Sequence, residues 1–121
     1  MKYPVKRRFP RPSRNRGPRW MAVLVTTPDR TTSEKMSRGL VQNKLAACVN
    51  RVPGLTSRYW WNGKMETARE ELLVIKTNRA KFSGLIQWVR QHHPYTVCEI
   101  VALPIARGNQ AYLRWIDQSL R

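Results

Sequence analysis

The sequence contains few acidic residues and few cysteines. Seven Asp and Glu stand against 23 Lys and Arg, which gives a formal net charge of +16. A hydrolase site built from paired carboxylates would have to draw on these few acids, and Glu66, Glu70 and Glu71 on one predicted strand are expected to be solvated or interface charges. Cys48 and Cys98 form neither a CxxC pair nor a disulfide framework, which favours a reducing cytoplasm as the location.

Other functional signals are also missing. No apolar run approaches the roughly 18 residues that a membrane span needs, so we expect no membrane partner. The six glycines are scattered and form no phosphate-binding loop, and no serine has an evident base beside it. The RNA-recognition signature, a basic residue followed by alternating glycine and aromatic residues, is absent as well. The sequence therefore predicts a protein without enzymatic activity.

The most informative stretch is a predicted β-hairpin over residues 46–77. Asn62-Gly63 at its centre is typical of a type I′ turn, which needs positive φ at both positions. Each arm has room for about 14 residues and spans roughly 46 Å, whereas a body of this size is about 33 Å across. The tip carries three aromatic residues, Tyr59, Trp60 and Trp61. Because a protruding aromatic ribbon is marginal in water alone, we interpret the hairpin as an oligomerisation arm.

Residues 1–19 differ from the rest of the chain. They hold eight basic residues, four prolines and no acid, a composition that cannot bury enough apolar surface to fold. We therefore predict a basic, disordered extension followed by one domain over residues 20–121. A nucleic-acid partner would rest on this extension alone and is the less favoured interpretation. Starting the chain at Met21 is expected to leave its stability nearly unchanged.

The domain reads as alternating strands and helices. Residues 21–27 form a short buried strand, and Thr31 with Glu34 fits a capping box at the start of the first helix. Asn78 is expected to cap a second helix, and Pro94 forces that helix to end at the histidines before it. These assignments place one helix before the hairpin and one after it.

The remaining elements complete a recognisable order. Residues 97–103 read as the last strand, and Pro53-Gly54 is expected to bulge or bend the first hairpin arm. The apolar face of a final helix is predicted to consist of Tyr112, Trp115, Ile116 and Leu120. The order β-α-β-β-α-β plus a C-terminal helix predicts an α+β, ferredoxin-like sandwich with a long central hairpin. Both main helices then cover one face of a four-stranded antiparallel sheet.

The densest collection of metal-ligand side chains lies in residues 92–99. His92, His93, Cys98 and Glu99 together offer imidazole, thiolate and carboxylate, which suit copper or zinc. Adjacent histidines at a helix end point in different directions, however, and this spacing matches no standard zinc pattern. A histidine at a helix C-terminus also interacts favourably with the helix dipole. From spacing alone, both a metal site and a structural role stay open.

Short sequence blocks follow one another through residues 20–121. They are Val25–Asp29, Lys44–Asn50, Pro53-Gly54, Tyr59–Lys64, Ile75–Thr77, His93–Tyr95, Glu99, Leu103-Pro104 and Tyr112-Leu113 with Trp115. In this order the blocks resemble the CutA family of divalent-cation tolerance proteins. The resemblance implies a homotrimer whose long hairpins pair with neighbouring subunits, and a role in tolerance of copper and other divalent cations.

The resemblance also implies a copper site. Its positions in this chain are Val25, His92, His93 and Glu99. Because valine cannot ligate copper, the thiol contribution is missing, and we expect at most weak binding of copper or another divalent cation, with no cofactor required. The alternative is a trimeric small-ligand sensor that binds its ligand in clefts between subunits, with Lys76 as a candidate cleft residue.

Overall fold

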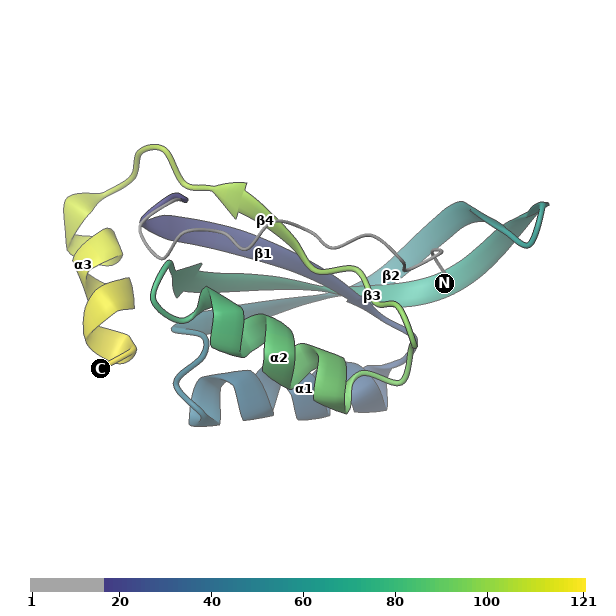
Figure 1. Ribbon diagram of the computed structural model, residues 1–121, viewed down its shortest axis with the longest axis horizontal. Helices are drawn as coiled ribbons and strands as arrows, with labels where there is room; N and C mark the ends of the chain where they lie inside the picture. The colour runs from purple at the N-terminus through teal and green to yellow at the C-terminus, as the bar shows by residue number, and fades with distance from the viewer. Residues whose placement is uncertain (1–16) are drawn as a thin grey trace.

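The computed structural model describes residues 17–121, so residues 1–16 of the predicted extension lie outside the described part. The elements are β1 (Trp20–Thr27), α1 (Arg30–Gln42), β2 (Cys48–Trp61), β3 (Lys64–Asn78), α2 (Phe82–His92), β4 (Val101–Pro104) and α3 (Gln110–Ser119). The strands form one antiparallel sheet in the order β2-β3-β1-β4. Helices α1 and α2 cover one face of the sheet, which confirms the predicted ferredoxin-like architecture (Figure 1).

The core lies between the sheet and these two helices. Alternate residues of β1 are buried, as the two-residue period of a strand requires when one face is covered. The buried apolar side chains are Met21, Val23 and Val25 of β1, Met36 and Leu40 of α1, Leu73 and Ile75 of β3, Leu85 and Val89 of α2, and Ala46. No helix among residues 17–121 is long and apolar enough to cross a membrane.

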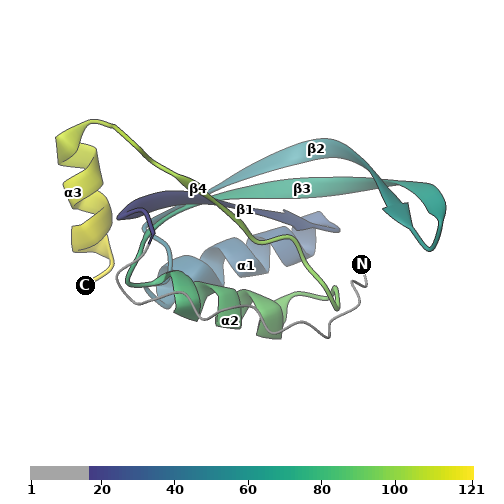
Figure 2. The same ribbon diagram turned by 45° about the horizontal axis from the view of Figure 1, so that its top comes forward.

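The hairpin extends well beyond the helices, as Figure 2 shows for β2 and β3. Asn62 (φ 50°) and Gly63 (φ 76°) both have positive φ, which confirms the predicted type I′ geometry. The arms contain 14 and 15 residues. The pairing register shifts between Val52 and Leu55, where Gly54 has a φ of 78°, so the predicted bulge is also confirmed.

Both helix caps differ from the prediction. Helix α1 begins at Arg30, because Asp29 has the extended backbone of an N-cap and its Oδ1 accepts a hydrogen bond from the Thr32 amide at 2.8 Å. Thr31 therefore lies inside the first turn. Helix α2 begins one turn later than expected, after Lys81, and Asn78 Oδ1 accepts from the Lys81 amide at 3.3 Å in the preceding turn. The helix ends at His92, as Pro94 predicted.

Strand β4 is shorter than predicted. Its pairing with β1 runs only from Pro104 opposite Met21 to Val101 opposite Leu24. Beyond that point the carbonyl oxygen of Thr26 accepts a hydrogen bond from the side chain of His93, so a side chain occupies the β1 edge that a longer strand would use. Residues 97–100 consequently approach β4 without sheet pairing.

The predicted apolar face of α3 is half wrong. Ile116 and Leu120 are buried together with Leu113, and they pack against Trp20, Ala47 and Ile105. Tyr112 and Trp115 instead remain 39% and 42% exposed, with their rings stacked at 5.4 Å. Leu113 and Tyr112 both have a helical spacing to Ile116 and Leu120. The buried face contains the smaller Leu113, and the two aromatic rings lie outside it.

Candidate functional site

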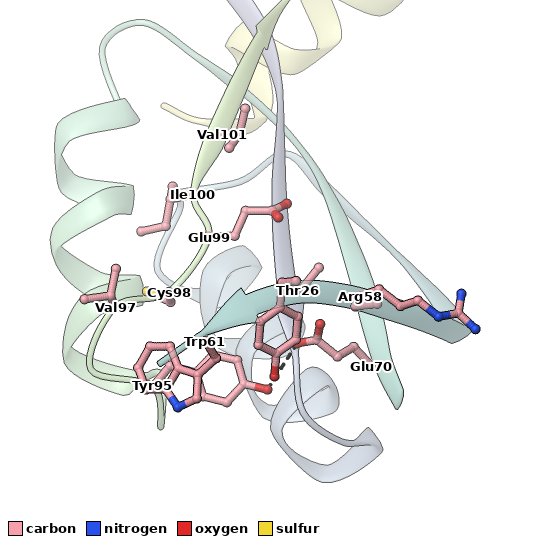
Figure 3. A pocket seen from close by; sticks show the side chains of 12 residues that line it. Thr26, Arg58, Trp61, Glu70, Tyr95, Val97, Cys98, Glu99, Ile100 and Val101 are labelled. Carbon is pink, nitrogen blue, oxygen red and sulfur yellow. Dashed lines mark hydrogen bonds between the residues drawn. The ribbon is translucent and has the colours of Figure 1, made fainter. Parts of the chain in front are cut away.

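A cavity of about 680 Å³ lies beneath the outer half of the hairpin (Figure 3). Its walls come from β2, from β3, from the end of β1 and from the segment 95–101 that leads into β4. The two-residue period of β2 turns Tyr59 and Trp61 toward this cavity, where both are half-buried. Trp60, between them, is 76% exposed.

Tyr95 and Glu70 form the polar centre of the cavity. The Tyr95 hydroxyl donates a hydrogen bond to Glu70 Oε2 at 3.1 Å, and Glu70 is only 8% exposed. Burial and the negative charge of Glu70 together raise the pKa of Tyr95 to about 12, so the phenol stays protonated and remains a donor at neutral pH. This hydrogen bond fixes the Tyr95 ring in the cavity wall.

Glu99 provides a second carboxylate in the same wall. Burial raises the pKa of Glu99, and the nearby negative charge of Glu70 raises it further. Within residues 17–121, neither Glu70 nor Glu99 forms an ion pair with a lysine or arginine. Arg58 also borders the cavity, but Figure 3 shows its side chain extending away from the two carboxylates.

Glu70 and Glu71, at the bulge, were expected to be solvated or interface charges, and they are not solvated in the described chain. Glu70 and Glu71 are consecutive yet both buried, at 8% and 9% exposure. Glu71 accepts a hydrogen bond from Arg51 Nη2 at 3.0 Å. A regular strand would turn one of the two outward, but the partner strand changes register opposite this point, so the alternation is interrupted. The sequence signal that could have located Glu70 is Pro53-Gly54.

His93 is held by hydrogen bonds at both ring nitrogens. Its Nδ1 accepts from the Tyr95 amide at 3.1 Å, so the proton must be on Nε2, which donates to the Thr26 carbonyl at 2.8 Å. Burial lowers the pKa of His93, which favours this neutral form. His92 is exposed and stacks on Trp88 at 4.1 Å, with its Nδ1 donating to the Trp88 carbonyl at 2.7 Å.

These positions do not fit a preformed metal centre. No group of three or more His, Cys, Asp or Glu side chains in residues 17–121 is placed to hold a metal ion. The structure therefore does not gather His92, His93 and Glu99 into one ligand set, and His93 has no free ring nitrogen. Val25, at the position where the resemblance implies a thiol, is fully buried in the core.

The last candidate residue lies elsewhere. Lys76 of β3 is paired with Cys48 of β2, and its Nζ donates a hydrogen bond to Asn50 Oδ1. It does not line the cavity beneath the hairpin. Tyr95, Cys98 and Glu99, which do line it, belong to residues 92–99, so the predicted cluster of metal-ligand side chains overlaps with the cavity wall.

Comparison with known proteins gives consistent matches. The family model for the CutA1 divalent ion tolerance protein matches residues 21–119. A "Protein CutA homolog" of Xenopus laevis is 52% identical over 95 residues, which cover 78% of this chain and 63% of the frog protein. The "Protein CutA 1, chloroplastic" of Oryza sativa subsp. japonica is 45% identical over 101 residues, covering 84% of this chain and 57% of the rice protein. The chain thus spans about three fifths of the length of these two curated relatives.

A solved structure agrees with the sequence matches. The divalent cation tolerance protein Cut A1 of Thermus thermophilus superposes with a TM-score of 0.79 at 48% sequence identity. The match covers 80% of this chain and 94% of that structure.

Proposed function

Because the chain belongs to the CutA1 divalent ion tolerance family, we propose that it is a non-enzymatic divalent-cation tolerance protein that acts as a homotrimer. The observation that supports a homotrimer is that both edges of the sheet are open. Strands β2 and β4 each have one neighbour in the described chain, and they lie at opposite ends of the strand order. Unpaired edges are templates for another strand.

Exposed apolar side chains lie along both edges. Val52 on β2 is 40% exposed, and Val101 and Leu103 on β4 are each 46% exposed. Pairing β4 of one copy with β2 of the next is a head-to-tail contact, which closes into a ring when the rotation permits. A ring of three is the assembly that the family resemblance implies, and in it the hairpin of each copy extends over its neighbour. Trp60 at the hairpin tip supplies a further exposed anchor of the kind that interfaces favour.

Cation binding in this proposal is weak. Ligation by His92, His93 and Glu99 requires His93 to release either the Thr26 carbonyl or the Tyr95 amide, which opposes binding. His92 is the accessible member, since it is exposed on the last turn of α2. We also propose a reducing, cytoplasmic setting, because Cys48 and Cys98 are both free thiols.

Native mass spectrometry and sedimentation of the full chain, with and without copper, test the proposal. We expect a trimer, and Trp60→Ser should shift it toward monomer or aggregate, whereas Val41→Ser on α1, also an exposed apolar position, should leave it intact. A monomeric wild type would overturn the assembly. A copper adduct that persists unchanged in His92→Ala would overturn the assignment of the metal ligands.

A further inference from the structure

We propose that the cavity beneath the hairpin binds a small organic cation, an ammonium compound with a short apolar body. This inference goes beyond cation tolerance, and the cavity described here is lined by residues of a single chain. Three properties of the cavity support it: its charge, its aromatic walls and its size.

The first property is the negative charge of the cavity wall. With 23 basic and seven acidic residues, each acid has many possible partners, and Glu34, Glu71 and Asp117 are indeed paired with arginines. Glu70 and Glu99 are not paired within the described residues, although they face the same cavity and both are at least half-buried by their surroundings. A buried carboxylate beside a partly buried one, with no counter-charge, is unfavourable, and a bound cation would compensate both.

The walls next to these carboxylates are aromatic. Tyr59, Trp61 and Tyr95 all line the cavity, and Tyr95 is held in place by its hydrogen bond to Glu70 (Figure 3). The face of an aromatic ring attracts a cation through its quadrupole, most strongly for tryptophan, and sites for quaternary ammonium groups are commonly built from such rings. A cavity that combines aromatic faces with carboxylates therefore selects an organic cation over a neutral molecule of the same shape.

The size of the cavity excludes a bare metal ion as the matched ligand. Its volume of about 680 Å³ falls in the range of small-molecule pockets, roughly 300–1,000 Å³. The cavity is also lined by apolar side chains, those of Val97, Ile100 and Val101. A divalent ion needs several oxygen, nitrogen or sulfur ligands at short range, and the described residues gather no set of three such side chains. An ammonium group with attached carbons uses both kinds of wall.

Isothermal titration calorimetry of the full chain tests the proposal with two isosteric probes. Choline carries the quaternary ammonium group, and 3,3-dimethylbutan-1-ol replaces its charged nitrogen by carbon. We expect choline to bind at least about tenfold more tightly than the alcohol, a difference of ~1.4 kcal/mol. Equal binding of the two probes, or no binding of choline or of the diamine putrescine at millimolar concentration, would overturn the proposal.

Matched carboxamide variants locate the site. Glu99→Gln should weaken choline binding about tenfold or more, which is ~1.4 kcal/mol, and leave the alcohol unaffected. Glu66→Gln is the control, because it makes the same change of charge on β3, at a position that does not line the cavity. Equal losses in the two variants would indicate only a general effect of protein charge and would overturn the assignment. Trp61→Leu gives an independent check, since it should lower choline affinity without changing net charge.

Two further measurements separate this proposal from the proposed function. Copper that displaces choline equally well from the wild type and from His92→Ala would mean that the cavity itself is a metal site, which contradicts the proposal. Sedimentation of the same samples reports assembly independently. A trimer that fails to bind choline overturns the present inference alone, whereas a choline-binding monomer overturns the trimer alone.

Discussion

Gly39 of α1 lies so close to Trp88 of α2 that a Cβ atom added at Gly39 would sit 2.4 Å from Trp88 Cζ2. The Trp88 ring is half-buried and His92 stacks on it at 4.1 Å, so a retreat of the ring would disturb this stacking. Gly39 therefore permits the close packing of the two helices against each other. The absence of a side chain at this position is a requirement of packing rather than of backbone conformation.

We accordingly expect Gly39→Ala to destabilise the protein, although alanine is the better helix former. The propensity gain is about 1 kcal/mol, and forcing extra volume into a packed interface costs ~1–3 kcal/mol or more when the contact is this short. Urea denaturation measures the net effect. Gly84→Ala in α2 is the matched control, since its nearest neighbour would be a flexible Leu45 methyl at 3.3 Å, and it should be neutral or stabilising. A stabilised Gly39→Ala protein would contradict this packing.

Arg51 should be more important for stability than any exposed arginine of the same network. Its three donors reach Ser33 Oγ at 2.9 Å, Glu34 Oε2 at 2.8 Å and Glu71 Oε1 at 3.0 Å. Arg51→Ala leaves Glu71 buried without its partner, so we expect a loss of roughly 2 kcal/mol in the free energy of unfolding. Arg38→Ala removes an exposed ion pair with the same Glu34 and should change stability little. Similar losses of stability in both variants would show that the hydrogen bonds of Arg51 to α1 and Glu71 contribute no more than the exposed Arg38–Glu34 ion pair.

His93 predicts a pH dependence of stability. Burial lowers its pKa in the folded protein below the ordinary value of 6.5, so between these two values the unfolded chain binds a proton that the folded protein does not. Stability should therefore be full above about pH 6.5 and decline as the pH falls from there through the folded-state pKa. Urea midpoints measured across this range should fall in the wild type and become flatter in His93→Gln. An unchanged pH profile in that variant would show that His93 is not the responsible group.

Trp20 is expected to anchor α3 to the sheet. Its indole Nε1 donates to Asp117 Oδ1 at 3.1 Å, and its ring packs against the buried face of α3. The expectation that a chain starting at Met21 keeps its full stability therefore needs correction, because that truncation removes Trp20. Trp20→Ala should cost about 2 kcal/mol or more, whereas Trp20→Phe, which keeps most of the packing and loses the donor, should cost about 1 kcal/mol. Equal melting temperatures of all three proteins would exclude this anchoring role.

Local rules predicted those parts of the fold that depend on neighbouring residues. Asn62-Gly63 specifies its turn through backbone sterics alone, and Pro94 stops α2 for the same kind of reason. The cap of α1 was ambiguous because both Asp29 and Thr31 can accept the required hydrogen bond. The order of helices and strands along the chain was then sufficient to predict the ferredoxin-like arrangement, without any knowledge of contacts between them.

The candidate site was less predictable because it depends on contacts between distant segments. His93 has the sequence context of a metal ligand, and its hydrogen bond to the carbonyl of Thr26, 67 positions away, could not be read from that context. Glu70 reads as a surface charge until the bulge on the neighbouring strand places it in the interior. Likewise, no sequence rule distinguishes Leu113 from Tyr112 as the buried residue of α3.

The bulge at Pro53-Gly54 also divides the outer edge of β2 into two unequal lengths. Proline has no backbone N–H, and the register shift beside it breaks the regular spacing of donors and acceptors along the edge. An added strand can match the spacing of residues 48–52 or that of residues 55–61, but a straight strand cannot match both. The edge is thereby protected against indefinite stacking of copies into fibres, while a short strand such as the four-residue β4 still fits on one side of the break.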